Sequence, residues 1–135
     1  MRIINWNIRG LNDLNKCDKV KKILKDFNID IALFQESKIE NPNFRFFRRL
    51  GGFYIRHWVS LPAIGTSGGL LIGWRDNSFK LLRTINRRHS LHIILIKLSD
   101  NSIIYISNVY GPNSKIGHRV LWSECLDFRK FAPGQ

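Results

Sequence analysis

The sequence predicts an α/β fold whose first two strands are parallel neighbours. Three apolar, β-branched runs, over residues 2–10, 29–37 and 103–113, each end in a polar side chain: Asn7, Glu36 and Tyr110. A segment with helical spacing separates the first two runs. Strands that each bring one polar group to the same rim of a sheet are typical of α/β hydrolytic sites.

The N-terminal segments predict a strand, a helix and a second strand. Residues 2–8 form a buried strand, and Asn15 is a suitable N-cap for a helix over 16–27. Residues 31–34 form the next strand. Apolar side chains recur at helical spacing between the two strands, at Cys17, Val20, Ile23, Leu24 and Phe27.

A connection this short between two strands predicts a right-handed crossover and parallel pairing. Functional groups of such sheets lie at the carboxyl ends of the strands, where Asn7 and Glu36 come together.

The rest of the chain predicts mainly strands. Residues 38–50 form a loop or short helix, and helical spacing returns over 116–131. Residues 67–74 are rich in glycine but lack the Gly-Lys-Ser/Thr of a phosphate-binding loop, so a bulge or a close strand approach is favoured. Strands are expected at 53–59, 67–74, 79–86, 91–98 and 103–110.

Composition favours a folded, basic protein of 135 residues with 22 Lys and Arg against 10 Asp and Glu, a net charge of +12. Nucleic acid is the favoured partner for this charge, while an anionic membrane surface and simple solubility remain alternatives. No apolar run reaches about 20 residues and no signal peptide is evident, so we expect an intracellular protein, nuclear or cytoplasmic. Cys17 and Cys125 lack zinc-ligand spacing and are expected to be reduced thiols.

The candidate chemistry is metal-assisted hydrolysis of a phosphodiester. Glu36 is a suitable Mg²⁺ or Mn²⁺ ligand, although a salt bridge to an arginine would also explain it. Asn7 could hold the metal or its water, or cap a turn, and Tyr110 could contact a phosphate or simply pack in its strand. Asn113 is suited to a phosphate contact or to a turn. The histidines, His57, His89, His92 and His118, show no ligand or triad pattern.

A basic surface interleaved with phenylalanines is the candidate nucleic-acid face. Scattered surface arginines are the alternative for each member, and the helix lysines fit a solvated face. The candidates are Arg45, Arg48, Arg49, Arg83, Arg87 and Arg88, beside Phe44, Phe46 and Phe47.

Three motifs resemble those of the endonuclease/exonuclease/phosphatase superfamily: Trp6-Asn-Ile-Arg-Gly10, Gln35-Glu-Ser37 and Asn108-Val-Tyr-Gly-Pro112. With the glycine-rich run at 67–74, they resemble the apurinic-type endonuclease domain of plant LINE retrotransposons. The resemblance implies a four-layer α/β sandwich, DNase I-like, that acts on DNA without a small-molecule cofactor.

The resemblance also implies roles for single residues. Glu36 would bind the Mg²⁺ or Mn²⁺, and Asn7 would organise the metal site. Tyr110 would hydrogen-bond the scissile phosphate, with Asn113 and Arg9 as nucleic-acid contacts.

The Gly-Asp-Phe-Asn and Ser-Asp-His motifs that follow in this superfamily are not found. We therefore expect residues 1–135 to be a truncated domain that lacks its second half, exposes an apolar sheet face, and is inactive alone. The rival hypotheses are a non-catalytic nucleic-acid-binding remnant and a phosphatase of the same superfamily.

Overall fold

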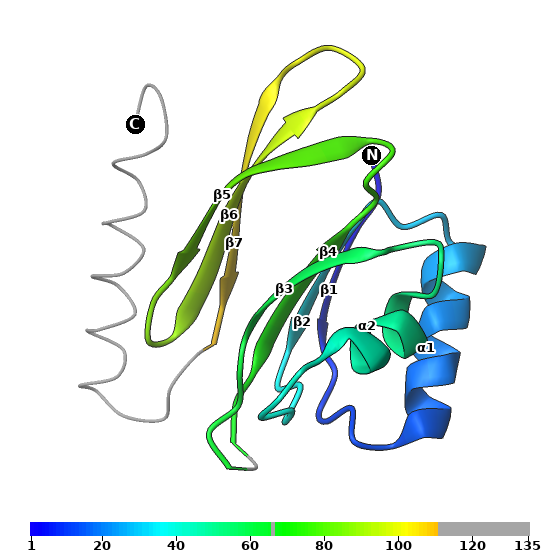
Figure 1. The fold of residues 1–135 in the computed structure, drawn as a ribbon, viewed down its shortest axis with the longest axis vertical. Helices are drawn as coiled ribbons and strands as arrows, with labels where there is room; N and C mark the ends of the chain where they lie inside the picture. The colour runs from blue at the N-terminus through cyan, green and yellow to red at the C-terminus, as the bar shows by residue number, and fades with distance from the viewer. Residues whose placement is uncertain (66, 111–135) are drawn as a thin grey trace.

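Two sheets packed face to face, with two helices on the outer side of the first, form the part of the chain that the structure describes (Figure 1). The structure is a computed structural model that describes residues 1–65 and 67–110. The first sheet has the order β1-β2-β4-β3 and the second the order β5-β6-β7. The predicted α/β sandwich is thus confirmed, while the helix predicted over 116–131 lies outside the described residues. The strands are β1 (Ile3–Asn7), β2 (Ile31–Gln35), β3 (His57–Leu61), β4 (Leu70–Trp74), β5 (Phe79–Asn86), β6 (Ser90–Lys97) and β7 (Ile103–Val109), and the helices are α1 (Leu14–Asp26) and α2 (Phe44–Gly51).

The predicted parallel pairing of β1 and β2 is confirmed, with register from Ile3 opposite Ile31 to Asn7 opposite Gln35. All other strand pairs of the two sheets are antiparallel. The predicted N-cap of α1 was wrong: Asp13 caps the helix, and its carboxylate accepts a hydrogen bond of 2.9 Å from the Asn15 N–H. Asp13 and Asn15 are both residue types that favour the N-cap position, and the Asp13 carboxylate accepts from a free N–H of the first turn.

The segment after α2 also differs from the prediction. A strand was expected over 53–59, but β3 begins only at His57 and continues to Leu61. Gly52 ends α2 with a φ of 59°, and the Ile55 N–H bonds the Gly51 carbonyl, so the intervening residues form a turn. The strand expected at 67–74 begins at Leu70, because Gly68 and Gly69 have positive φ angles of 74° and 97°.

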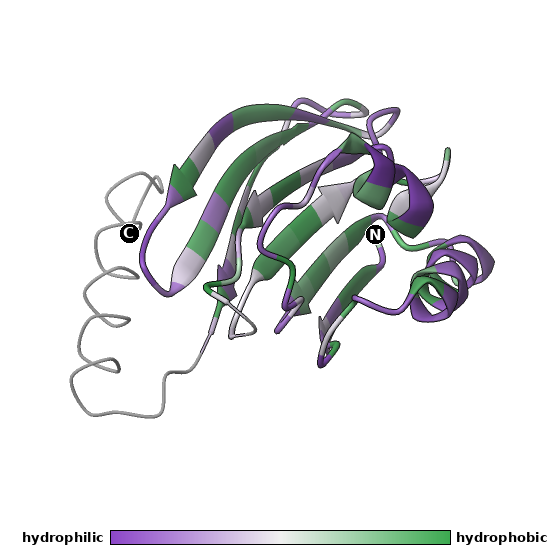
Figure 2. Cartoon of the chain, turned by 60° about the horizontal axis from the view of Figure 1, so that its bottom comes forward, coloured by the Kyte–Doolittle hydropathy of each residue, from purple (hydrophilic) through white to green (hydrophobic). Residues whose placement is uncertain are grey.

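Strand β2 contributes to both hydrophobic cores. Ala32 and Phe34 face the helices, where they pack with the apolar side of α1. Ile31 and Leu33 face the second sheet and pack with apolar side chains of β4, β6 and β7. Figure 2 shows the many hydrophobic residues of the strands of both sheets in green. By the alternation of a strand, Gln35 belongs to the inter-sheet face, at the end where polar residues begin.

No helix among the described residues is long and apolar enough to cross a membrane.

Candidate active site

The loops that follow β1 and β2 are joined by backbone hydrogen bonds. The parallel ladder continues past both strands: Ile8 N–H donates to the Gln35 carbonyl at 3.0 Å, and Gly10 N–H to the Glu36 carbonyl at 2.7 Å. The Asn12 side-chain amide then donates to the Lys38 carbonyl at 3.0 Å. The backbone of Glu36 therefore has a fixed position beside the end of β1, where Asn7 lies.

Backbone strain is concentrated at this rim. Arg9, Glu36 and Lys38 have φ angles of 56°, 54° and 59°, in the left-handed region that side chains rarely adopt. The other described non-glycine residues with positive φ are Asn28 and Asn101, and asparagine tolerates this conformation well. Strained residues persist only where their surroundings hold them, and they are common at functional sites.

The start of β4 supports the strained segment from its other side. Ser37 N–H donates to the Gly69 carbonyl at 3.1 Å, and Lys38 N–H to the Gly68 carbonyl at 2.9 Å. A Cβ atom on Gly69 would lie 2.2 Å from the Ser37 hydroxyl oxygen. The close strand approach predicted for the glycine-rich run is therefore confirmed, and it involves the residue next to Glu36.

An amide network lies directly beneath the rim. The Gln35 Nε2 donates to Asn5 Oδ1 at 2.6 Å and to Asn108 Oδ1 at 2.7 Å. The buried Asn108 Nδ2 donates in turn to the carbonyls of Phe34 and Leu71, at 3.0 and 2.9 Å. The network joins β1, β2, β4 and β7 at one end of the inter-sheet core.

Sequence reasoning assigned no role to Asn5, Gln35 or Asn108. The available signal was the recurrence of Asn at positions 5 and 7 of an otherwise apolar strand. Of the three side chains only Asn108 is buried, and a buried amide needs partners, which the Gln35 amide and two backbone carbonyls provide here.

The structure brings the three predicted catalytic residues, which all lie in the described segments, to the same rim. Asn7 is exposed at the end of β1, and Glu36 is half-buried one residue beyond β2. Tyr110 follows Asn108 by two residues, packs against the inter-sheet core, and its N–H donates to the His89 carbonyl at 2.9 Å. Arg9 is exposed in the loop after β1, and Asn113 lies outside the described residues.

Within residues 1–65 and 67–110, the side chains of Glu36 and Asn7 form no hydrogen bond, and the Glu36 carboxylate forms no salt bridge. The arginine partner considered for Glu36 is therefore not found in the described part. A half-buried carboxylate without a partner suits a ligand better than it suits packing. No group of three or more His, Cys, Asp or Glu side chains that could hold a metal occurs among the described residues.

Two of the shifted pKa values belong to side chains outside the rim. Burial raises the pKa of the Cys17 thiol, which is fully covered in α1. Burial also acts to raise the pKa of Asp76, but the hydrogen bond and charge of Arg56 outweigh it, so that pKa is lowered. His92 is buried between the hydroxyls of Ser107 and Ser90, at 2.8 Å from each.

Solved structures of other proteins have a fold similar to that of this chain. An apurinic/apyrimidinic (AP) endonuclease from Leishmania major aligns with a TM-score of 0.61 and 20% identity, covering 95% of this chain and 45% of that one. A humanized D. rerio TDP2 aligns with a TM-score of 0.67 and 16% identity, covering 97% and 56%. The 2′,3′-cyclic phosphatase ANGEL2 aligns with a TM-score of 0.65 and 16% identity, covering 86% and 39%.

No protein-family model and no curated protein matches the sequence. The chain spans about half the length of the structures that it matches. Those structures belong to the endonuclease/exonuclease/phosphatase superfamily. With its two packed sheets and the helices on the outer face of the first, this chain has a DNase I-like fold, over part of the length of that fold.

Proposed function

We propose that the rim formed by Asn7, Glu36 and Tyr110 is a divalent-metal site for nucleic-acid phosphodiesters, of the kind found in the endonucleases of plant LINE retrotransposons. The observation that carries the proposal is the Glu36 carboxylate: it is half-buried, strained in its backbone, held on two sides and without a partner in the described part of the chain. The solved structures of similar fold include an AP endonuclease, which supports a nucleic-acid substrate.

The donor atoms at the rim fit Mg²⁺ or Mn²⁺. Both ions prefer oxygen ligands, and the Glu36 carboxylate and the Asn7 side-chain carbonyl supply them. A bound divalent ion would polarise the phosphate and lower the pKa of a coordinated water. The backbone hydrogen bonds beyond β1 and β2 keep the backbone that carries both side chains in place when substrate binds.

The remaining rim residues act on the substrate itself. The Tyr110 hydroxyl donates a hydrogen bond to a non-bridging oxygen of the scissile phosphate, where negative charge grows during attack. Arg9 and Asn113 contact the nucleic-acid backbone next to the scissile phosphate. The net charge of +12 raises the local concentration of DNA at the surface. The proposal includes a location inside the cell, in the nucleus or the cytoplasm.

We expect residues 1–135 to bind DNA without cutting it at an appreciable rate. Within residues 1–65 and 67–110, Glu36 belongs to no group of three or more His, Cys, Asp or Glu side chains, so the described part does not assemble the several acidic and histidine groups that orient the attacking water and protonate the leaving group. Removing members of a catalytic constellation reduces rates by several orders of magnitude.

Nicking of supercoiled plasmid in Mg²⁺ tests this proposal. The assay compares the wild type with Glu36→Gln and with Glu40→Gln, a control carboxylate that already accepts a hydrogen bond from the Gly65 N–H. We expect no nicking by any variant and salt-sensitive DNA binding by all three. Nicking that requires both metal and Glu36 would contradict inactivity while supporting the site.

A phosphatase is the second candidate, because ANGEL2, a 2′,3′-cyclic phosphatase, has a similar fold. Hydrolysis of nucleoside 2′,3′-cyclic phosphates, with no effect of DNA as a competitor, would favour it. A non-catalytic nucleic-acid-binding remnant is the third candidate. Metal binding that does not depend on Glu36, together with intact DNA binding, would favour that one.

A further inference from the structure

The outer surface of the two helices is basic and carries exposed phenyl rings. Two adjacent hollows of about 600 and 470 Å³ open there, along α1 and α2. Figure 1 places these helices on the side of the first sheet that faces away from β5, β6 and β7. We call this surface the helix patch; its basic members are Lys21, Lys22, Lys25, Arg45, Arg48 and Arg49.

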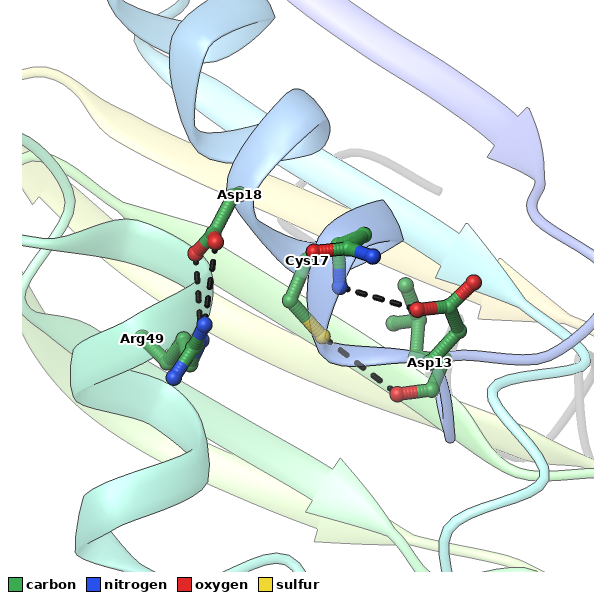
Figure 3. A network of polar contacts seen from close by, with 6 residues as sticks. Asp13, Cys17, Asp18 and Arg49 are labelled. Atoms are coloured by element: carbon green, nitrogen blue, oxygen red, sulfur yellow. Dashed lines mark hydrogen bonds and ion pairs between the residues drawn. The ribbon is translucent and has the colours of Figure 1, made fainter.

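The helix patch keeps most of its positive charge. Its two acidic residues are each paired: Asp26 with Lys22 at 2.9 Å, and Asp18 with Arg49 at 3.0 Å (Figure 3 shows the second pair). Four further cations have no acidic partner in the described part of the chain. They are Lys21, Lys25, Arg45 and Arg48.

The aromatic members are unusually exposed. Phe44 and Phe53 are each 75% exposed, far more than a ring of this size normally is in a folded domain. The Arg48 guanidinium lies 3.9 Å from the centroid of the Phe53 ring and 5.9 Å from that of Phe44. Arg48 thus lies beside two exposed phenyl rings, and further cations of the helix patch lie next to them.

We propose that the helix patch binds single-stranded nucleic acid, with bases stacked on Phe53 and Phe44 and phosphates held by Lys21, Lys25 and Arg45. Rings and unpaired cations in alternation are the features with which proteins hold single strands without reading their sequence. A duplex offers the same phosphates but hides the faces of its bases. The exposed rings therefore favour the single strand.

The helix patch is separate from the rim. Lys21 and Lys25 lie in the second half of α1, which runs away from the carboxyl ends of β1 and β2. No residue of the patch belongs to the amide network or to the loops that hold Glu36. Binding at the patch therefore does not depend on the metal site.

Fluorescence anisotropy of the full chain with labelled oligothymidylate of about 15 nucleotides, and with a duplex of equal length, tests the proposal. We expect Phe53→Ala to weaken single-strand binding about ten-fold and duplex binding less than about two-fold, and Phe44→Ala to act in the same direction. Phe27→Ala, which removes a ring 59% exposed outside the patch, should change neither. Circular dichroism confirms that each variant is folded.

Two further comparisons separate the proposal from its rivals. Log affinity falls as log salt concentration rises, and Lys25→Gln and Arg45→Gln should each make this slope less steep by about one. Lys80→Gln on β5 should not change the slope. Equal losses on single strand and duplex, or no loss with Phe53→Ala, would overturn the proposal. So would Phe53-dependent binding to phosphatidylserine vesicles without any preference for single strands.

Discussion

Replacing Gly69 by alanine should destabilise the fold through the segment that carries Glu36. Gly69 has a φ of 97°, and a Cβ there would lie 2.2 Å from the Ser37 hydroxyl oxygen and 3.2 Å from the Lys38 nitrogen. An unfavourable φ costs about 1–3 kcal/mol, and overpacking a closed site costs about 1–3 kcal/mol more. We therefore expect Gly69→Ala to lower the free energy of unfolding by about 2–6 kcal/mol.

Gly68→Ala is the matched control. Gly68 also has a positive φ, of 74°, but a Cβ at that position meets nothing within 4 Å. It should cost only the backbone strain, about 1–3 kcal/mol. The difference between the two variants isolates the contact with Ser37. Urea unfolding followed by tryptophan fluorescence gives both values.

A double-mutant cycle tests the cause. Ser37→Ala removes the oxygen that the new methyl group would meet at 2.2 Å, and leaves the closer-than-usual contacts with the Lys38 nitrogen at 3.2 Å and Ser37 Cβ at 3.3 Å. Ser37→Ala should therefore recover part of the loss in Gly69→Ala, with a coupling of about 1–2 kcal/mol. Equal destabilisation by Gly68→Ala and Gly69→Ala, or no coupling with Ser37→Ala, would refute this reasoning.

Three further predictions concern the amide network and the shifted pKa values. Asn108→Leu should lower the free energy of unfolding in urea by about 2–4 kcal/mol, because it removes the side chain that donates to the Phe34 and Leu71 carbonyls and that accepts one hydrogen bond of the Gln35 amide. The control Asn86→Leu, at an exposed position, should change it by no more than about 0.5 kcal/mol. In a Cys125→Ser background, Cys17 should react with a disulfide reagent at about pH 8 at least 100-fold more slowly when folded than in urea, because its buried thiol has a raised pKa; equal rates would contradict its burial. Because the pKa of Asp76 is lowered by Arg56, its contribution to stability is present above about pH 4 and is lost as the pH falls through the folded pKa. Asp76→Asn should therefore flatten the acid side of the curve of melting temperature against pH. An unchanged curve would contradict the pairing of Asp76 with Arg56.

The parallel pair β1–β2 and the position of Glu36 were predictable because their signals are local. Alternating or continuous apolar runs fix where the strands lie, and a short helical connection fixes their direction. Glu36 then comes to the rim because it is the first charged residue after β2. These steps need only residues that are close in the sequence.

The amide network could not be predicted in the same way. The Gln35 amide reaches Asn5 and Asn108, which are 30 and 73 positions away in the sequence. Asn5 lies on the neighbouring strand β1, but Asn108 lies on β7 of the second sheet. The position of Asn108 is fixed by the packing of the second sheet on the first, which strand periodicity does not determine. The start of β3 was missed for a related reason, because the turn after α2 depends on the left-handed Gly52.

The most direct test of the metal site is a titration with Mn²⁺ followed by two-dimensional amide NMR. Paramagnetic broadening reports which residues lie near the bound ion, whether or not the chain has any activity. Our account predicts selective broadening of the Asn7, Glu36 and Ser37 amide signals in the wild type and in Glu40→Gln, its loss in Glu36→Gln, and recovery of all signals with EDTA. Broadening at these positions that persists in Glu36→Gln, or that occurs only elsewhere, would contradict the assignment of the rim as the metal site.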